Sequence, residues 1–152
     1  MRKISITSYC SNFKYNKKSI NNIFLMLDKY KTYSAHNGEL SVVFMNNQQI
    51  SKIHYKFMKK KNFTDVITFP YKEKCMNFIG EICISIEYAK NSSIQHNTSF
   101  SKEITLYIIH GWLHLIGYND KNIIEANEMR KHELIILNLL NKKKLIPYFF
   151  FI

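Results

Sequence analysis

The 152-residue sequence is poor in glycine and proline, with four and two residues respectively. A collagen-like repeat needs glycine at every third position and flexible low-complexity segments are rich in both residues, so both classes are excluded. The sequence also lacks any run of about 18 apolar residues, the length needed to span a bilayer. We therefore expect a globular protein that folds in water and has no membrane partner.

Cysteine is scarce as well, and Cys10, Cys75 and Cys83 form no CxxC pair. Three cysteines cannot supply a framework of paired disulfides, which favours a reducing compartment. The N-terminus begins with basic residues, but polar residues follow where a secretory signal peptide requires an apolar stretch. We expect a cytoplasmic protein.

Acidic residues are half as numerous as basic ones, 11 against 22, which gives a formal net charge of +11. A basic surface favours nucleic acid or an anionic membrane as a partner. However, only Arg2 and Arg130 are arginine, and the abundant Lys, Asn, Ile, Phe and Tyr share A/T-rich codons. Genome composition explains the lysine excess as well as function does, so the function must be argued from a site.

The hydrophobic patterning is that of one domain with mixed secondary structure. Alternating or continuous apolar residues predict strands over 2–7, 39–46, 65–70 and 78–86. Apolar residues at helical spacing predict helices over 17–33, about 50–57, 85–95, 104–116 and 123–140. Residues 148–152 (YFFFI) are predicted to be a strand or a tail on the core. The predicted fold is therefore a single α+β domain over residues 1–152, with a small mixed β-sheet of about four strands packed with about five helices.

The most informative segment runs from His110 to Asp120 and reads HGWLHLIGYND. Two histidines four residues apart on a helix differ by about 40° of rotation and about 6 Å of rise, so both imidazoles project from one face. Gly117 can adopt the left-handed conformation that ends a helix, which lets the chain return Asp120 to the two rings. Two imidazoles and one carboxylate leave a fourth position for water, as in a catalytic zinc site.

An alternative interpretation makes both histidines hydrogen-bonded core residues and Asp120 the cap of the next helix. Three features favour the metal site. Unpaired imidazoles would be costly to bury in an otherwise apolar helix. Gly111 and Gly117, two of only four glycines, fall within this segment. Finally, Asn122 with Glu125 forms an N-cap signature of its own, which leaves Asp120 free.

The spacing HxxxHxxGxxD also matches the ligands of zinc peptidases that carry an HExxH helix. In those enzymes the glutamate after the first histidine is the general base. The corresponding residue here is Gly111, which cannot accept a proton. A zinc peptidase is therefore excluded.

The segment 110–120 resembles the signature of the YbeY family of bacterial endoribonucleases, which reads approximately HGxLHLxGYDH. Three further segments are similar to family motifs in the same order: NFTDVITFPY (62–71), IGEICIS (79–85) and EANEMRKHE (125–133). The resemblance covers about residues 40–140. It implies a mixed sheet with helices on it, one zinc ion per chain and single-stranded ribosomal RNA as the substrate.

The function implied by this resemblance is a zinc-dependent, single-strand-specific endoribonuclease of ribosomal RNA maturation and ribosome quality control. The small ribosomal subunit is then a partner, and we expect a monomer. The alternative is a ribosome-associated assembly factor with a structural metal and little or no nuclease activity. An open metal position favours the nuclease, whereas Met58, in the column where many members have a basic residue, favours the alternative.

The resemblance also defines candidate site residues and departures from the family. Asp120 stands where the family usually has a third histidine ligand, and a carboxylate is an acceptable zinc ligand. Glu81 replaces an aspartate, and either Glu81 or Glu133 could orient a ligand or accept a proton. Glu81 could equally be a solvated strand residue. The metal ligands are predicted to be His110, His114 and Asp120.

The candidate RNA-binding residues are basic and lie just before the TDV block: Lys56, Lys59, Lys60 and Lys61. They would position the phosphate backbone, although lysine cannot make the bidentate phosphate contact of arginine. Exposed aromatic residues could stack on unpaired bases. Thr64 and Asp65 either contact RNA or form a turn.

Overall fold

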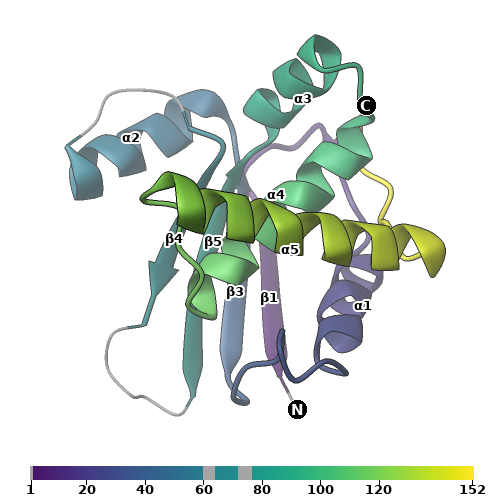
Figure 1. Cartoon of the computed structure of the whole chain (residues 1–152). Helices are drawn as coiled ribbons and strands as arrows, with labels where there is room; N and C mark the ends of the chain where they lie inside the picture. Colours follow the sequence, from purple (N-terminus) through teal and green to yellow (C-terminus); the bar gives the residue numbers. More distant parts are fainter. Residues whose placement is uncertain (1, 60–63, 72–76) are drawn as a thin grey trace.

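The computed structural model describes residues 2–59, 64–71 and 77–152 of the chain (Figure 1). Its elements follow in the order β1 (Lys3–Ser8), β2 (Phe13–Lys14), α1 (Lys17–Leu27), β3 (Glu39–Met45), α2 (Asn47–Met58), β4 (Val66–Pro70), β5 (Phe78–Ser85), α3 (Ile86–Gln95), α4 (Phe100–Leu115), α5 (Ile123–Lys142) and β6 (Phe150–Phe151). The predicted α+β class, with a mixed sheet of four strands and five helices in one domain, is confirmed.

The main sheet has the strand order β1-β3-β5-β4. The first three strands are parallel, and β4 runs antiparallel to β5 and forms one edge. Side chains alternate between the two faces of a strand, so Ile82 and Ile84 point to one face while Glu81 and Cys83 point to the other. This alternation separates two hydrophobic clusters.

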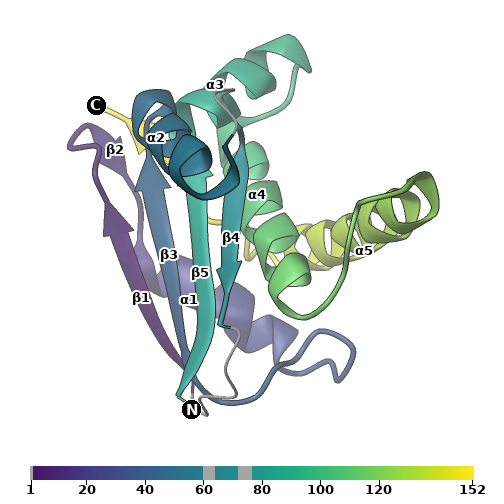
Figure 2. The same cartoon turned by 90° about the vertical axis from the view of Figure 1, so that its left-hand side faces the viewer.

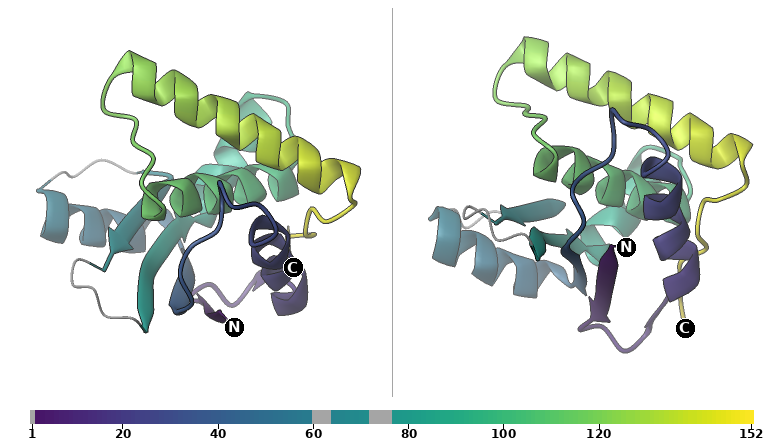
Figure 3. Two further views of the ribbon diagram at one scale, coloured as in Figure 1. Left: turned by 60° about the horizontal axis from the view of Figure 1, so that its bottom comes forward. Right: turned by 90° about the horizontal axis from the view of Figure 1, so that it is seen from below.

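The larger cluster lies between the sheet and the layer formed by α1 and α4. It contains Ile82 of β5, Phe24 of α1 and Trp112 of α4, all almost completely buried. The smaller cluster lies on the opposite face, where Ile50 of α2 packs with Val43 and Cys83. Figures 2 and 3 show α2 on one face of the sheet and α4 on the other, with α5 stacked on the outer side of α4.

Helix α4 lies close to β5 because Gly111 faces the sheet. A Cβ atom on Gly111 would lie 2.5 Å from Cγ2 of Ile82, so only glycine allows this approach. Ser99 caps the helix by accepting a hydrogen bond from the amide of Lys102. Because of this cap, α4 begins four residues earlier than the predicted residue 104. The helix therefore places its last turns directly over the β4 edge of the sheet.

Two parts of the fold differ from the sequence-based prediction. Helix α1 ends at Leu27 rather than near Tyr33, and the following residues form turns. The side chain of Tyr33 leaves the helical direction and bonds His132 of α5 at 2.7 Å, a tertiary contact that the helical spacing does not reveal. The C-terminal segment forms the strand β6, which is one of the two predicted possibilities. Its partner β2 was not predicted, because β2 is only two residues long. Among the described helices, none is both long and apolar enough to cross a membrane.

Candidate metal centre

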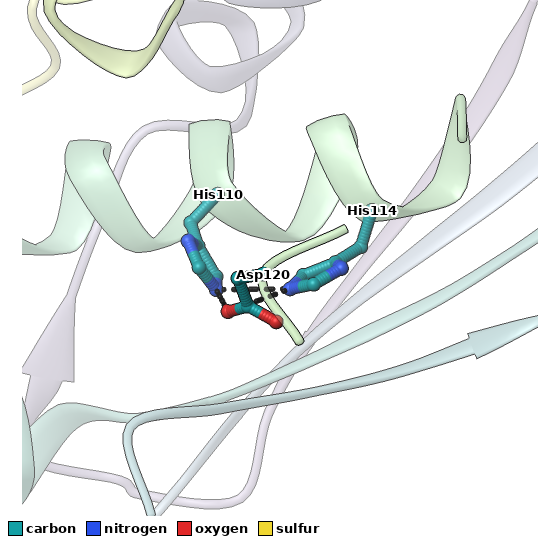
Figure 4. Close-up of side chains that lie close together, drawn as sticks. All are labelled: His110, His114 and Asp120. Carbon is teal, nitrogen blue, oxygen red and sulfur yellow. Dashed lines mark hydrogen bonds and ion pairs between the residues drawn. The ribbon is translucent and has the colours of Figure 1, made fainter. Parts of the chain in front are cut away.

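The side chains of His110, His114 and Asp120 converge beside the last turns of α4 (Figure 4). The Nε2 atoms of the two histidines are 3.1 Å apart. Oδ2 of Asp120 lies 3.7 Å from Nε2 of His110 and 3.5 Å from Nε2 of His114. The histidine side chains are about one-quarter exposed and the aspartate is 45% exposed. The three donor atoms therefore face one point that is open to solvent.

The return of the chain after α4 brings Asp120 to the two rings. Gly117 has φ +111°, a conformation that side chains other than glycine rarely adopt. The amide of Tyr118 donates to the carbonyl of Leu113 at 2.9 Å, which closes the end of the helix. The N-cap of α5 is Asn122, whose side chain accepts from the amide of Glu125. Asp120 is therefore not the cap of that helix.

In each ring Nδ1, the nitrogen that points away from the shared centre, contacts a hydrogen-bond acceptor. Nδ1 of His110 lies 2.5 Å from Oε1 of Glu133 on α5. Nδ1 of His114 lies 3.1 Å from the carbonyl oxygen of Tyr118. A carboxylate and a carbonyl both require a donor, so we assign the proton to Nδ1 in each ring. The lone pair of each Nε2 then points to the shared centre, as it does in histidine ligands of metals.

The environment moves the pKa values of the two histidines in opposite directions. For His110, burial lowers the pKa, but the hydrogen bond and charge of Glu133, with the charges of Asp65 and Asp120, outweigh it, and the pKa is raised. For His114, burial and the neighbouring His110 lower the pKa, and Asp120 offsets this only in part. The site therefore concentrates negative charge on the His110 side, where it favours a cation.

The residues fit a zinc ion in both spacing and chemistry. Zinc bound by nitrogen or carboxylate oxygen at about 2.0–2.1 Å in a tetrahedron has donors about 3.4 Å apart. The three separations among Nε2 of His110, Nε2 of His114 and Oδ2 of Asp120 are 3.1, 3.5 and 3.7 Å. Two imidazoles and one carboxylate form a donor set typical of catalytic zinc. The predicted ligands are thus brought together by the structure.

Glu133 and Glu81, the two candidate acidic residues, lie in different places. Glu133 contacts His110 directly. Glu81 lies on the face of the sheet opposite α4, where its carboxylate accepts a hydrogen bond from Sγ of Cys83 at 3.4 Å. The structure does not bring Glu81 to the metal centre, because strand alternation places Ile82 rather than Glu81 under α4. This placement argues against the predicted catalytic role of Glu81.

Two of the candidate RNA-binding lysines, Lys56 and Lys59, lie at the C-terminal end of α2. Lys56 and Lys59 are exposed, and Lys59 ends the helix in a left-handed conformation with φ 57°. Met58 is 45% exposed beside them. Lys60 and Lys61 lie outside the described residues. The structure thus places the two described lysines on a helix that packs against the sheet face opposite α4.

Sequence reasoning missed a second layer of contacts behind the rings. His132 of α5 bonds the hydroxyl of Tyr33 at 2.7 Å and Oε1 of Glu128 at 3.1 Å. Its ring also packs against Tyr118, whose carbonyl holds His114. The spacing of Glu128 and His132, four residues apart, was the available signal, but the partner Tyr33 is 99 residues away in sequence. These contacts fix the loop that supports the metal centre.

The sequence matches the family model described as Endoribonuclease YbeY over residues 5–141. A relative of that name from Borreliella afzelii is 34% identical and covers 95% of this chain and 98% of its own. Another from Karelsulcia muelleri is 42% identical and covers 80% of this chain and 83% of its own. A solution structure of a Thermotoga maritima protein is similar with a TM-score of 0.61 and 25% identity, over 93% of this chain and 91% of that one.

Proposed function

The chain belongs to the YbeY endoribonuclease family, and from this premise we propose that it is a zinc-dependent endoribonuclease. The proposed substrate is single-stranded ribosomal RNA, and the proposed role is RNA maturation and quality control of ribosomes in the cytoplasm. The whole chain, residues 1–152, would act as one catalytic domain, as a monomer that works on the small ribosomal subunit.

The observation that carries this proposal is the convergence of His110, His114 and Asp120 at an open position. One zinc ion held by these residues would act as a Lewis acid towards a phosphodiester oxygen and lower the pKa of a water molecule. The opening lets a phosphate group of a large substrate approach the centre from solvent. The exposed side chain of Asp120 forms one border of that opening.

The protein's own residues set the orientation of the site. Glu133 fixes the ring of His110 through Nδ1, and the carbonyl of Tyr118 fixes His114 in the same way. Both contacts hold the proton on Nδ1 and direct Nε2 of each imidazole at the centre. Because the carboxylate of Glu133 contacts Nδ1 of His110, we assign Glu133 a role in positioning that ring.

Lys56 and Lys59, with Lys60 and Lys61, would hold the RNA backbone by charge. The formal net charge of +11 supports an RNA partner, since electrostatic attraction to phosphate accounts for much of the affinity of RNA-binding proteins. The second candidate function is a ribosome assembly factor with little nuclease activity. The specific observation in its favour is Met58, which offers no charge where many family members have a basic residue.

Cleavage of a single-stranded fragment of ribosomal RNA tests the proposal. We expect cleavage by the purified protein, loss of cleavage after chelation and recovery when zinc is returned. The double substitution His110→Ala, His114→Ala should remove both the zinc and the activity. Zinc-loaded wild-type protein that binds the fragment without cleaving it would favour the assembly factor instead.

A further inference from the structure

We propose that the last turn of α2 is a base-stacking platform for single-stranded RNA, in which Phe57 is the stacking ring and Lys56 and Lys59 contact the adjoining phosphates. The inference rests on the proposed function, because it names how the RNA substrate is held beside the metal centre. It adds an aromatic contact to the charge contacts that the sequence predicts.

The apolar stripe of α2 passes from the core to the solvent along its length. Ile50 is completely buried, Ile53 is partly buried and Phe57 is 61% exposed. Figures 1 and 3 show the cause, since the C-terminal end of α2 extends past β4, the edge strand of the sheet. A phenyl ring at this end of the helix presents apolar surface to water. Such a ring can stack on an unpaired base, because every base has a π-face.

The orientation of the Phe57 ring is fixed by a neighbouring side chain. Its ring packs on Phe69 of β4 with the centroids 5.1 Å apart and an angle of 67° between the planes. A tilted contact of this kind fixes the orientation of a ring without covering both of its faces. Because the ring is already fixed, stacking of a base on it would cost little additional side-chain entropy.

Cationic side chains accompany the exposed ring. Nζ of Lys56 lies 5.5 Å from the centroid of Phe57, within the range of a cation–π contact. Nζ of Lys59 lies 5.9 Å from the ring of Tyr55, one turn earlier on the same helix. An apolar surface of a protein partner would have to desolvate these ammonium groups. A single strand of RNA matches both features, with a base for the ring and phosphates for the lysines.

The platform and the metal centre lie on either side of one edge strand. Helix α2 packs on one face of the sheet and α4 on the other, and β4 lies between them at the edge (Figure 2). Asp65 immediately precedes β4, and α4, which carries His110 and His114, packs on that strand. Five residues separate Lys59 from Asp65, so the two positions are at most about 22 Å apart. An extended RNA strand that crosses the β4 edge can therefore reach both places.

Binding of an unstructured oligouridylate to chelator-treated, zinc-free protein tests the platform without dependence on cleavage. We expect Phe57→Leu, which keeps an apolar contact with Phe69, to raise the dissociation constant about fivefold to a hundredfold, the range for one base–aromatic stack. The dependence of log affinity on log salt should not change, because no charge is removed. Lys56→Ala should instead reduce that salt dependence.

Two further variants make the result specific. Tyr9→Leu is the matched control, since Tyr9 is 62% exposed and lies at the end of β1, and it should leave the affinity unchanged. Phe57→Trp should retain the affinity, and the new indole fluorescence should be quenched by oligouridylate but not by the corresponding RNA duplex.

An affinity of Phe57→Leu equal to that of the wild type would overturn the platform while leaving the proposed nuclease intact. An equal loss in Tyr9→Leu would also overturn it, because the effect would then not depend on this surface. Absence of any binding of single-stranded RNA by the wild-type protein would instead count against the proposed function itself.

Discussion

Glu133 determines the orientation of His110, because its carboxylate contacts Nδ1 of that ring. We predict that Glu133→Gln weakens zinc binding about tenfold to a hundredfold, the usual effect of losing a hydrogen-bonding partner of a ligand. The amide can still accept the hydrogen bond but carries no charge. A competition titration with a chromophoric chelator measures the change.

Glu128→Gln is the matched control for this substitution. Glu128 lies on the same helix and contacts His132 at 3.1 Å, but it has no contact with either predicted histidine ligand among those that the structure describes. Its substitution should change zinc affinity by less than about threefold. A comparable loss in both variants would mean that charge in general, rather than the contact with His110, governs the affinity.

The pH dependence of zinc binding follows from the raised pKa of His110. A proton and zinc compete for the imidazole, so affinity should rise with pH and level off only above the pKa of this group. Since Glu133 raises that pKa above its ordinary value of about 6.5, the rise should extend beyond pH 6.5 in the wild type. In Glu133→Gln the rise should end at lower pH. The same titration repeated across a pH series measures both curves, and identical curves would exclude this role of Glu133.

At the scale of residues, the sequence was sufficient to predict which donors come together but not what lies behind them. The i, i+4 spacing of His110 and His114 and the glycine after the helix define local geometry, and the structure brings the two rings and Asp120 together. The position of Glu81 depends on which face of β5 meets α4. That choice is made by Gly111 against Ile82, a long-range contact that no local pattern encodes.

Helix α4 depends on the close approach of Gly111 to the sheet. We predict that Gly111→Ala destabilises the fold by about 1–3 kcal/mol, because its Cβ would overlap Cγ2 of Ile82 and force the helix away from β5. Urea denaturation measures this difference. Displacement of α4 would also move both histidines, so zinc affinity should fall in the same variant.

A double-mutant cycle distinguishes overlap of the new Cβ atom with Ile82 from a general effect of replacing glycine in a helix. Ile82→Ala removes the atoms that would clash, so Gly111→Ala should cost less in that background than in the wild type. Gly117→Ala is the control, because a Cβ there meets no atom within 4 Å and its cost comes from φ +111°. Gly117→Ala and Ile82→Ala should be additive. Additivity of Gly111→Ala with Ile82→Ala would contradict the packing explanation.

The elements themselves were largely predictable, because most carry a complete apolar stripe or a strand-like run. The errors lie at ends and in short segments. Asn16, Ser85 and Ser99 cap their helices as local chemistry allows. The residues that follow α1 form turns instead of continuing the helix, and Tyr33 among them contacts His132, 99 residues away. The pair β2–β6 joins the two chain ends with two residues each, which is too little sequence to form a pattern.

The excess of positive charge belongs to the whole molecule. If lysines near α2 bind phosphate, RNA affinity should fall steeply with salt as counterions are released. Substituting Lys59, Lys60 and Lys61 with alanine should lower both the affinity and the salt dependence, as measured by fluorescence anisotropy of a labelled single strand. Equal damage from alanine at Lys142, Lys143 and Lys144, at the far end of α5, would show that diffuse charge is responsible.

The central claim is that His110, His114 and Asp120 bind the metal on which RNA cleavage depends. The most direct measurement is the zinc dissociation constant of the wild type, Asp120→Ala and Asp120→His, with cleavage of single-stranded ribosomal RNA measured on the same samples. We predict that alanine weakens zinc binding by about 3 kcal/mol, roughly a hundredfold, and reduces cleavage in parallel. Histidine should restore zinc binding, because imidazole is an equally good donor. Wild-type zinc affinity in Asp120→Ala would contradict the claim.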